Sequence, residues 1–367
     1  MQSKKIKSYS YYNLLDEHMS GRPFFDDLVL PRQLEIHLPG DGKRACNARC
    51  KHCQGRFFKK GLGKWEEIGL ELLHNLAGSI PYQIYGGAYT EPLLNQFLPQ
   101  YLRVTKQYHN HFGIHTNGIE LFRLQQESGF LDLLCELGED SIDYLSISLD
   151  GGERVSWGET KGVSPDLFDG IVKAMEIVGK LPHKFAFRVC YLMTEENTSI
   201  EAISNIVSIC KQNRVDSLRF SIPYDNYNKD FELLKQYNAD VEEPLDTKFG
   251  MLVAPFLSNS EGCTHIFYVS PKETCVWNYN FTQCIYPYYQ ITLGADGYMY
   301  RCSSTAAPNG KVTRLIPITA DLQDFCNAVK MAQDPNWKAQ TCFKNRLRCN
   351  RMAIEINQEY KRMTNGQ

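Results

Sequence analysis

Short runs of β-branched and aromatic residues alternate with amphipathic stretches over the first 224 residues of the chain. The runs predict six strands, at residues 32–38, 82–88, 112–116, 144–150, 185–193 and 217–223. Hydrophobic residues recur at helical spacing in five stretches between them, at residues 66–78, 91–108, 121–138, 165–179 and 198–213. Because each crossover between parallel strands needs a helix to return the chain, this alternation predicts a parallel sheet. The order favours an α/β fold, either a barrel or a doubly wound sheet.

The alternation ends near Tyr224, and the rest of the chain has a different composition. Residues 225–262 are mixed and polar, which indicates a bridging segment. Seven of the thirteen cysteines lie within residues 263–349, and this change in cysteine density marks a second domain. We therefore predict four parts: an N-terminal extension (1–31), an α/β domain (32–224), a bridge (225–262) and a small cysteine-rich α+β domain (263–367).

The charge of the chain excludes some functions. Its 367 residues include 40 Lys and Arg against 42 Asp and Glu, a net charge of −2. There is therefore no overall positive field to hold nucleic acid or an anionic membrane. The N-terminal MQSKKIKSYSYYNLL is basic but has no apolar core of signal-peptide length, and no later run reaches the 18 apolar residues of a membrane span. We expect a cytoplasmic protein that binds neither nucleic acid nor membrane.

Thirteen cysteines are many for a chain of this length. A secreted disulfide scaffold is one explanation, but the number is odd and an export signal is missing. Cytosolic thiols are kept reduced, so clustered cysteines favour metal ligands.

The clearest cluster is CNARCKHCQG (46–55), in which Cys46, Cys50 and Cys53 are separated by three and then two residues. Each iron of a cubane cluster takes a thiolate, and four cysteines are the usual closed set. Three cysteines leave one iron without a protein ligand, an open position of the kind that catalytic metal centres keep. The alternative, a zinc knuckle, needs a fourth Cys or His nearby, and His52 lies between the ligands, where it is badly placed.

Directly after a first strand, this spacing resembles the signature of the radical S-adenosylmethionine (SAM) superfamily. The resemblance implies a partial (β/α)6 TIM-like barrel and a [4Fe-4S] cluster bound by the three cysteines, with SAM chelating the open iron. An electron from the cluster then cleaves SAM to methionine and a 5′-deoxyadenosyl radical, which abstracts hydrogen from a substrate C–H bond. A low-potential donor such as flavodoxin or ferredoxin is implied as the electron source. The residue before the third cysteine is commonly aromatic in the family, and His52 fits this pattern.

Four further segments carry the resemblance along the chain. YGGAYTEPLL (85–94) resembles the family's GGEPLL segment, with Gly86, Gly87 and Glu91 matching and residues 88–90 departing from the usual spacing. In the family this backbone meets the SAM amino group, an approach that a Cβ would block. IHTNG (114–118), SISLDG (146–151) and the fifth strand add polar residues near strand carboxyl ends, where barrel ligands gather. The resemblance assigns SAM binding to Thr116, Asn117, Ser146, Ser148, Asp150 and Arg188. In this assignment the two serines, which share a face of the strand, hydrogen-bond the ribose of SAM, and Arg188 binds its carboxylate.

CIYPYYQITLGADGYMYRC (284–302) has two strand-like arms around an LGADGY turn. It resembles the opening of the SPASM and twitch extensions of radical SAM enzymes, whose hairpin carries ligands of an auxiliary iron–sulfur cluster. The resemblance favours one such cluster, bound by Cys284, Cys302, Cys342 and Cys349. The alternative is a small β-domain with buried free cysteines. Two candidate catalytic residues remain, each a hydrogen-atom donor, a replacement ligand or a buried thiol: Cys263 and Cys275.

Most proteins with this architecture, by family resemblance, mature ribosomally made peptides by crosslinking, epimerising or excising residues. We therefore favour a precursor peptide as the substrate. Only 45 residues precede Cys46, which leaves no room for the leader-recognition domain of many maturases, so we expect a separate peptide-recognition protein or direct binding at the barrel mouth. Dehydrogenation or rearrangement of a small sugar, cyclitol or nucleoside is the alternative. A non-catalytic iron–sulfur electron carrier is the third hypothesis, and the glycine-rich, TNG and SLDG segments argue against it because a carrier needs no SAM pocket.

Overall fold

The computed structural model describes most of the chain. The described residues are 28–53, 63–87, 89–223, 239–259, 263–274, 283–306, 313–334, 336, 342, 348–349 and 351–365.

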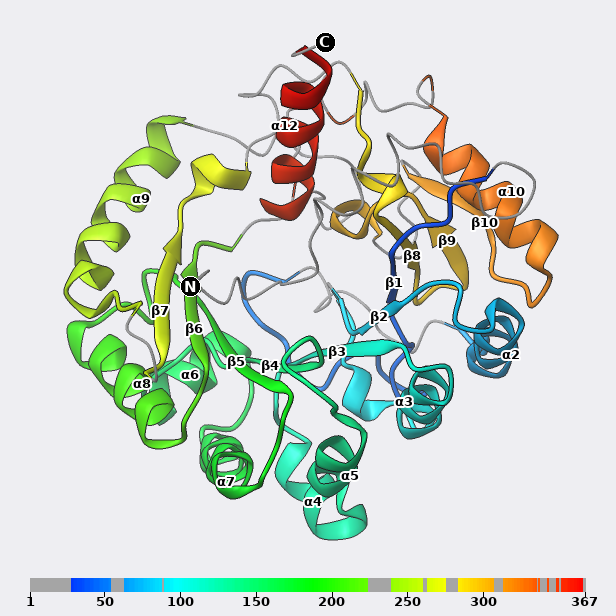
Figure 1. Ribbon diagram of the computed structural model, residues 1–367. Helices are drawn as coiled ribbons and strands as arrows, with labels where there is room; N and C mark the ends of the chain where they lie inside the picture. The colour runs from blue at the N-terminus through cyan, green and yellow to red at the C-terminus, as the bar shows by residue number, and fades with distance from the viewer. Residues whose placement is uncertain are drawn as a thin grey trace.

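One curved sheet runs through this part of the chain, with helices along its outer side (Figure 1). Its order is β10-β9-β8-β1-β2-β3-β4-β5-β6-β7, and the two ends do not pair with each other. Neighbours from β8 through β1 to β7 are parallel, whereas β8, β9 and β10 pair antiparallel. The strands are β1 (Gln33–Ile36), β2 (Tyr82–Tyr85), β3 (His111–Thr116), β4 (Tyr144–Ser148), β5 (Ala186–Leu192), β6 (Ser217–Ser221), β7 (His265–Val269), β8 (Gln290–Leu293), β9 (Tyr298–Tyr300) and β10 (Arg314–Pro317).

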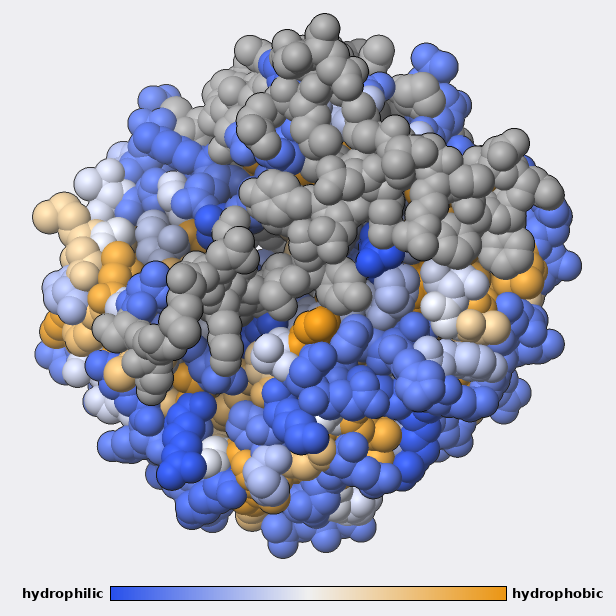
Figure 2. Space-filling view, viewed as in Figure 1, coloured by the Kyte–Doolittle hydropathy of each residue, from blue (hydrophilic) through white to orange (hydrophobic). Residues whose placement is uncertain are grey.

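Helices return the chain between the parallel strands. The helices of the described residues are α2 (Glu66–Leu76), α3 (Leu98–Gln107), α4 (Leu121–Ser128), α5 (Phe130–Leu137), α6 (Arg154–Lys161), α7 (Leu167–Lys180), α8 (Ile200–Gln212), α9 (Ala239–Val253), α10 (Leu322–Gln333) and α12 (Arg351–Asn365). Short 3-10 turns add η2 (Pro92–Leu94), η3 (Ala254–Phe256), η4 (Pro271–Thr274), η6 (Tyr286–Tyr288) and η7 (Ser303–Thr305). The face in Figure 2 is mostly hydrophilic over helices α3 to α7, as expected for the solvent side of amphipathic helices.

The two faces of the sheet differ in chemistry. Alternate residues such as Leu145, Val189 and Phe220 are completely buried in the main core with the helices. Their neighbours point to the opposite, inner face because side chains alternate along a strand. That inner face carries polar residues such as Ser146 and Arg188, so the fold places polar chemistry inside the curve of the sheet.

The sequence-based prediction of an α/β fold with a parallel, open barrel-like sheet is confirmed. Each of the six predicted strands is present within two or three residues of its expected ends. The predicted helix at 121–138 is divided into α4 and α5 at Gly129, whose φ of 63° lies in the left-handed region. Helices α6, α9, α10 and α12 were not predicted.

Strand β7 changes the boundary drawn from the sequence. It lies within the segment 263–367, which the cysteine density marks as a second domain, yet it pairs in parallel with β6 through Leu218↔Ile266 and Phe220↔Tyr268. With β8, which pairs in parallel with β1, the sheet therefore has two more parallel strands than the six expected. The polar bridge at 225–262 likewise contains helix α9, whose Asp246 accepts a hydrogen bond from Tyr268 at 2.7 Å.

The cysteine-rich segment joins the other edge of the same sheet. Strand β8 pairs in parallel with β1, from Gln33↔Gln290 to Ile36↔Leu293, and β9 and β10 continue outward on the right of Figure 1. A second small core lies next to it, formed mainly by η6 and α12. In the part of the chain that the structure describes, none of the helices has the length and apolarity needed to cross a membrane.

Candidate active site at the carboxyl ends of the strands

The loop after β1 carries the three-cysteine motif. Cys46, Cys50 and Cys53 are all partly buried free thiols. A hydrogen bond of 3.0 Å from the Cys53 amide to the Cys50 carbonyl tightens the second half of the motif. The Ala48 amide lies 3.4 Å from the Cys46 sulfur. The motif is therefore folded back on itself beyond the carboxyl end of β1.

The end of α6 holds this loop by its backbone. The Arg49 amide donates to the Lys161 carbonyl at 2.8 Å, and the Lys51 amide donates to the Thr160 carbonyl at 3.2 Å. These carbonyls belong to the last turn of a helix, where intrahelical partners run out. The cysteine loop thus donates hydrogen bonds to the free carbonyls at the end of α6, and these bonds position the loop.

On its other side the loop contacts the segments after β2 and β3. The Glu91 amide donates to the Ala45 carbonyl at 3.0 Å. The Asn117 side chain donates to Asn47 Oδ1 at 2.8 Å and lies 3.5 Å from the Cys46 sulfur. Asn117, which the resemblance assigns to SAM binding, therefore orients the first cysteine in the structure.

A buried ion pair lies beneath the loop. The Nζ of Lys161 donates to the Asp150 carboxylate and, at 2.6 Å, to the Ser148 carbonyl. Asp150 also accepts from the Leu192 amide at 2.7 Å and from the Ser148 hydroxyl at 3.1 Å. Burial raises the pKa of the Asp150 carboxyl, but the charges of Lys161 and His52 outweigh this and hold it below its ordinary value. Asp150 thus ties β4, β5 and α6 together, and both of its oxygens have partners.

Glu91 is also fully engaged within the protein. Oε1 accepts from Thr116 Oγ1 at 2.6 Å and from the Leu93 amide at 3.1 Å, and Oε2 accepts from the Asn117 amide at 2.8 Å. Burial raises the pKa of Glu91 to about 7 although these hydrogen bonds oppose the shift. The carboxylate therefore joins the glycine-rich segment to the end of β3, and the Thr116 hydroxyl is used in the same contact.

The two glycines after β2 pack against neighbouring strands. Gly86 has a φ of +95°, and its amide donates to the Ile36 carbonyl at 3.0 Å. A Cβ on Gly87 would overlap the ring of His37, which is buried and whose Nε2 lies 2.8 Å from Glu35 Oε1. Glycine at 87 is thus required by a side chain of the protein itself.

Strands β4 and β5 line the inner face next to the loop. Ser146 Oγ lies 3.5 Å from the Cys190 sulfur. The guanidinium of Arg188 lies 4.0 Å from the centre of the Tyr144 ring, a cation–π contact. The Nε of Arg188 is buried and has no hydrogen-bond partner among the described residues. Arg188 therefore has an unused hydrogen-bond donor on the inner face of the sheet.

The three-cysteine loop fits an iron–sulfur cluster by its donor chemistry. Burial, followed by the charge of Glu91, raises the pKa of the Cys46 thiol to about 12, and burial likewise raises that of Cys50. A bare thiolate is therefore disfavoured here, so these sulfurs ligate when a metal replaces their protons. Three partly buried thiols on one loop, with polar groups at Asn117 and Lys161 close by, suit such a group.

The C-terminal cysteines form a second group. Cys284, Cys302 and Cys349 pack together with the small core of η6 and α12. Burial, then the charges of Cys302 and Cys284, raises the pKa of Cys342 to about 12, which places the fourth thiol beside them. Asn357 of α12 accepts from the Ile285 amide at 2.9 Å and lies 3.6 Å from the Cys284 sulfur. Cys284, Cys302 and Cys349 thus border one small core, and Cys342 lies near enough to Cys302 and Cys284 for their charges to act on it.

Of the two candidate catalytic cysteines, the structure describes Cys263 alone. Cys263 is exposed, just before β7. Cys275 lies outside the described residues.

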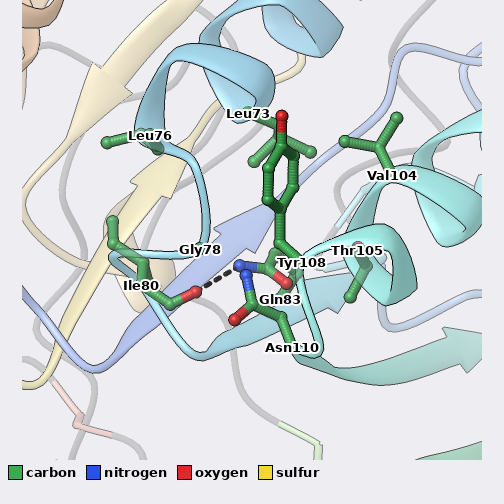
Figure 3. A pocket seen from close by; sticks show the side chains of 9 residues that line it. All are labelled: Leu73, Leu76, Gly78, Ile80, Gln83, Val104, Thr105, Tyr108 and Asn110. Carbon is green, nitrogen blue, oxygen red and sulfur yellow. Dashed lines mark hydrogen bonds between the residues drawn. The ribbon is translucent and has the colours of Figure 1, made fainter.

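Two other features lie away from the carboxyl ends of the strands. A cavity of about 10 Å³, room for about one water molecule, lies between α2, β2 and α3 (Figure 3). His111, Asp140 and Asp143 approach one another at the start of β3 and before β4, but Asp143 accepts from the Phe112 and Glu139 amides and pairs with Lys106. These contacts give Asp143 a structural role at the amino ends of the strands.

Sequence reasoning missed four residues around the site: His37, Lys161, Arg219 and Asn357. His37 follows β1 directly, and its place two residues after Glu35 is a usable signal because alternate residues share a face. Lys161 and Asn357 act through helices, and their spacing from the motifs gives no such signal.

Comparisons with known proteins bear on the fold. The sequence matches no family model and no curated protein. SuiB of Streptococcus suis bound to S-adenosylmethionine superimposes with a TM-score of 0.59 at 15% identity, over 90% of this chain and 71% of that one. The same protein bound to its precursor peptide SuiA gives 0.58 at 14% identity, over 89% and 69%. Native anSMEcpe with bound AdoMet gives 0.55 at 15% identity, over 92% and 99%. At such identities the likeness establishes a shared fold.

Proposed function

We propose that this chain, which has the fold of the radical SAM enzymes SuiB and anSMEcpe, is itself a radical SAM enzyme. The observation that carries the proposal is the Cys46, Cys50 and Cys53 loop, held by α6 at the carboxyl ends of parallel strands. In barrel enzymes this is the end where catalytic groups gather. The fold and the motif thus support the same activity independently.

In this proposal the three cysteines hold a [4Fe-4S] cluster and leave one iron for SAM. When bound, the cluster supplies the electron that cleaves SAM, and SAM supplies the group that abstracts hydrogen from a substrate C–H bond. The protein holds the loop through the carbonyls of Thr160 and Lys161 and orients Cys46 through Asn117. A low-potential electron donor such as flavodoxin or ferredoxin is the partner for the reduction.

Arg188 is the residue we propose for the SAM carboxylate. Its guanidinium is fixed against Tyr144, and its buried Nε has no partner in the part of the chain that the structure describes. Arginine suits the task because its planar donors match a carboxylate. Ser146, on the same face of β4, is proposed for the ribose. Ser148, Asp150 and Glu91 act indirectly, through the contacts that fix the loops.

Cys284, Cys302, Cys342 and Cys349 are proposed as ligands of one auxiliary iron–sulfur cluster. The shared small core of Cys284, Cys302 and Cys349, and the pKa values of Cys302 and Cys342, both about 12 and raised first by burial, support a metal in place of protons. Asn357 is then a supporting contact of the kind that orients metal ligands. Because β8 pairs with β1, the segments that carry the ligands of the two clusters are attached to the same sheet.

Maturation of a ribosomally made peptide is the reaction that we favour, with a precursor peptide as substrate and a separate peptide-recognition protein as a partner. Two proteins of the same fold support a peptide: SuiB is described bound to precursor peptide SuiA, and anSMEcpe to the Cp18Cys peptide. Dehydrogenation of a small sugar, cyclitol or nucleoside is the second candidate. The polar contacts of Glu35 with His37 and, at 2.6 Å, with Gln290 on the inner face favour it. Cys263 and Cys275 stay candidates for hydrogen-atom donation.

Deuterium transfer into 5′-deoxyadenosine distinguishes the two substrate classes. The reduced enzyme is given deuterated precursor peptide, with and without a separate peptide-recognition protein. In a second set of reactions it is given deuterated aminocyclitols or nucleoside sugars. Peptide maturation predicts label from the peptide, increased by a recognition protein through effective concentration. Label from the small molecules alone would reject it.

A further inference from the structure

Arg219 lies in the middle of β6, the strand next to the β7 edge of the sheet. It is the third residue of β6, beside Cys190 of β5 and Phe267 of β7. Its neighbours Leu218 and Phe220 are completely buried on the helix side. Because side chains alternate along a strand, Arg219 projects from the face that carries Arg188 and Cys190.

In the part of the chain that the structure describes, the Nε of Arg219 lacks an acceptor, while the residue as a whole is partly exposed. Its Nε is shielded from solvent and has no hydrogen-bond partner, and among the residues that the structure describes no carboxylate pairs with it. Buried polar groups in proteins are hydrogen-bonded in the large majority of cases, and a buried charged donor left alone is unfavourable. An arginine retained in this condition indicates an acceptor that comes from outside the chain.

A second arginine on the adjacent strand has the same deficit. Arg188 pairs in register with Ser217, two residues before Arg219, so both side chains lie on one face. Its Nε is also buried, and no described residue accepts a hydrogen bond from it. The inner face of β5 and β6 therefore offers two sets of unused cationic donors.

The carboxylates of the described residues nearest this end of the sheet have other partners. Glu35 contacts His37 and Gln290, Asp150 pairs with Lys161, and Glu91 accepts from Thr116 and two amides. The charge of the two arginines is thus not neutralised by these groups. A single SAM molecule has one carboxylate, which suffices for one arginine.

We infer that Arg219 binds a carboxylate of the substrate, while Arg188 binds that of SAM. This inference rests on the proposed function, which places SAM and substrate on the inner face. The planar guanidinium donates two parallel hydrogen bonds to a carboxylate, a geometry that lysine does not reproduce. The substrate class is then acidic: a peptide with a Glu, Asp or terminal carboxylate, or a small carboxylic acid.

The test uses anaerobically reconstituted full-length protein and probes that differ by one charge. Two peptide pools, identical except for Glu or Gln at a central position, are passed over immobilised enzyme with SAM, and retained peptides are quantified by mass spectrometry. In a parallel arm, binding of N-acetylglutamate is compared with that of N-acetylglutamine. Acid-dependent binding in the first arm alone identifies a peptide source, and in the second a small acid.

Arg219→Met and the matched Arg219→Lys are compared with the wild type. The wild type is expected to prefer the acid probe at least tenfold, Arg219→Met to bind acid and amide equally, and Arg219→Lys to keep part of the preference. Binding of the amide probe is expected to stay the same in all three, which a merely structural role of Arg219 would not give. Equal binding of acid and amide by the wild type in both arms overturns the inference, as does an acid preference that survives in Arg219→Met.

SAM binding by the wild type, measured first, separates this inference from the proposed function. If the wild type fails to bind SAM, the proposed function fails. If it binds SAM and shows no acid preference, only the substrate inference fails.

Discussion

Lys161 and Asp150 form an ion pair in which both side chains are almost completely buried, at 2% and 1% exposure. The same lysine donates to the Ser148 carbonyl, and its own carbonyl accepts from the Arg49 amide in the cysteine loop. One residue therefore connects the end of β4 with the loop that carries Cys46, Cys50 and Cys53. On the α6 side, the position of the loop depends on this pair, because Lys161 holds the helix end whose carbonyls accept from the loop.

Lys161→Met is expected to destabilise the metal-free protein by about 3–5 kcal/mol, because it leaves the Asp150 charge buried without its partner. The measurement is the free energy of unfolding from urea titration. The matched control is the double variant Lys161→Met with Asp150→Asn, which removes both charges and is expected to lose clearly less. A single variant no less stable than the double one contradicts the role of the pair.

Gly87→Val is expected to weaken SAM binding and to destabilise the protein by about 1–3 kcal/mol, the usual range for overpacking. Its added atoms would overlap the buried His37 ring and displace β1 or the glycine-rich segment. Gly170→Ala is the control, since a Cβ there meets only Phe122 at 4.0 Å. Equilibrium dialysis of labelled SAM reads out the effect, and equal affinity of wild type and Gly87→Val would show that this segment is not the binding edge.

The burial of Glu91 predicts a pH dependence of stability. Its pKa is about 7 in the folded protein against an ordinary value of 4.5. Between these values the folded state binds the proton more tightly, so the contribution of Glu91 to stability is fully present below pH 4.5 and is lost as the pH rises toward 7. The shift corresponds to roughly 3 kcal/mol. Urea titrations of the metal-free protein across this range measure it, and Glu91→Gln should flatten the curve; an identical slope in both proteins assigns it to other groups.

Asn357→Leu is expected to reduce the affinity of the auxiliary site for iron by about 10- to 100-fold, the usual effect of losing a contact that orients a metal ligand. The background is the triple variant Cys46→Ala, Cys50→Ala, Cys53→Ala, which should retain about four irons per chain if the auxiliary cluster is cubane. Iron assays after dilution and desalting compare the triple variant with and without Asn357→Leu. Equal iron retention by the two proteins would show that Asn357 does not help to orient Cys284 as an iron ligand.

The sequence predicted the sheet well because β-branched runs and helical periodicity are local signals. The motif cysteines were likewise visible, since their spacing is a local property. The partners of those motifs were not, because Lys161 reaches Asp150 only after the turn of α6 is formed. Likewise, the overlap of Gly87 with His37 depends on the β1–β2 register.

Strand β7 is an element of the sheet that the sequence did not predict. HIFYV has a strand-like composition, but it follows a polar segment in a region marked by its cysteines. Its membership of the barrel is decided by pairing with β6, a contact with a residue about 48 positions earlier in the chain. Long-range pairing of this kind has no signature in local periodicity.

The most direct test of the account is release of 5′-deoxyadenosine by the reduced protein. Anaerobically reconstituted wild type, supplied with dithionite and SAM, is compared by liquid chromatography and mass spectrometry with the Cys46→Ala, Cys50→Ala, Cys53→Ala variant. The account predicts 5′-deoxyadenosine from the wild type and none above background from the triple variant, whose auxiliary cysteines are intact. Equal amounts from both proteins, or none from a wild type that carries its full complement of iron, would contradict it.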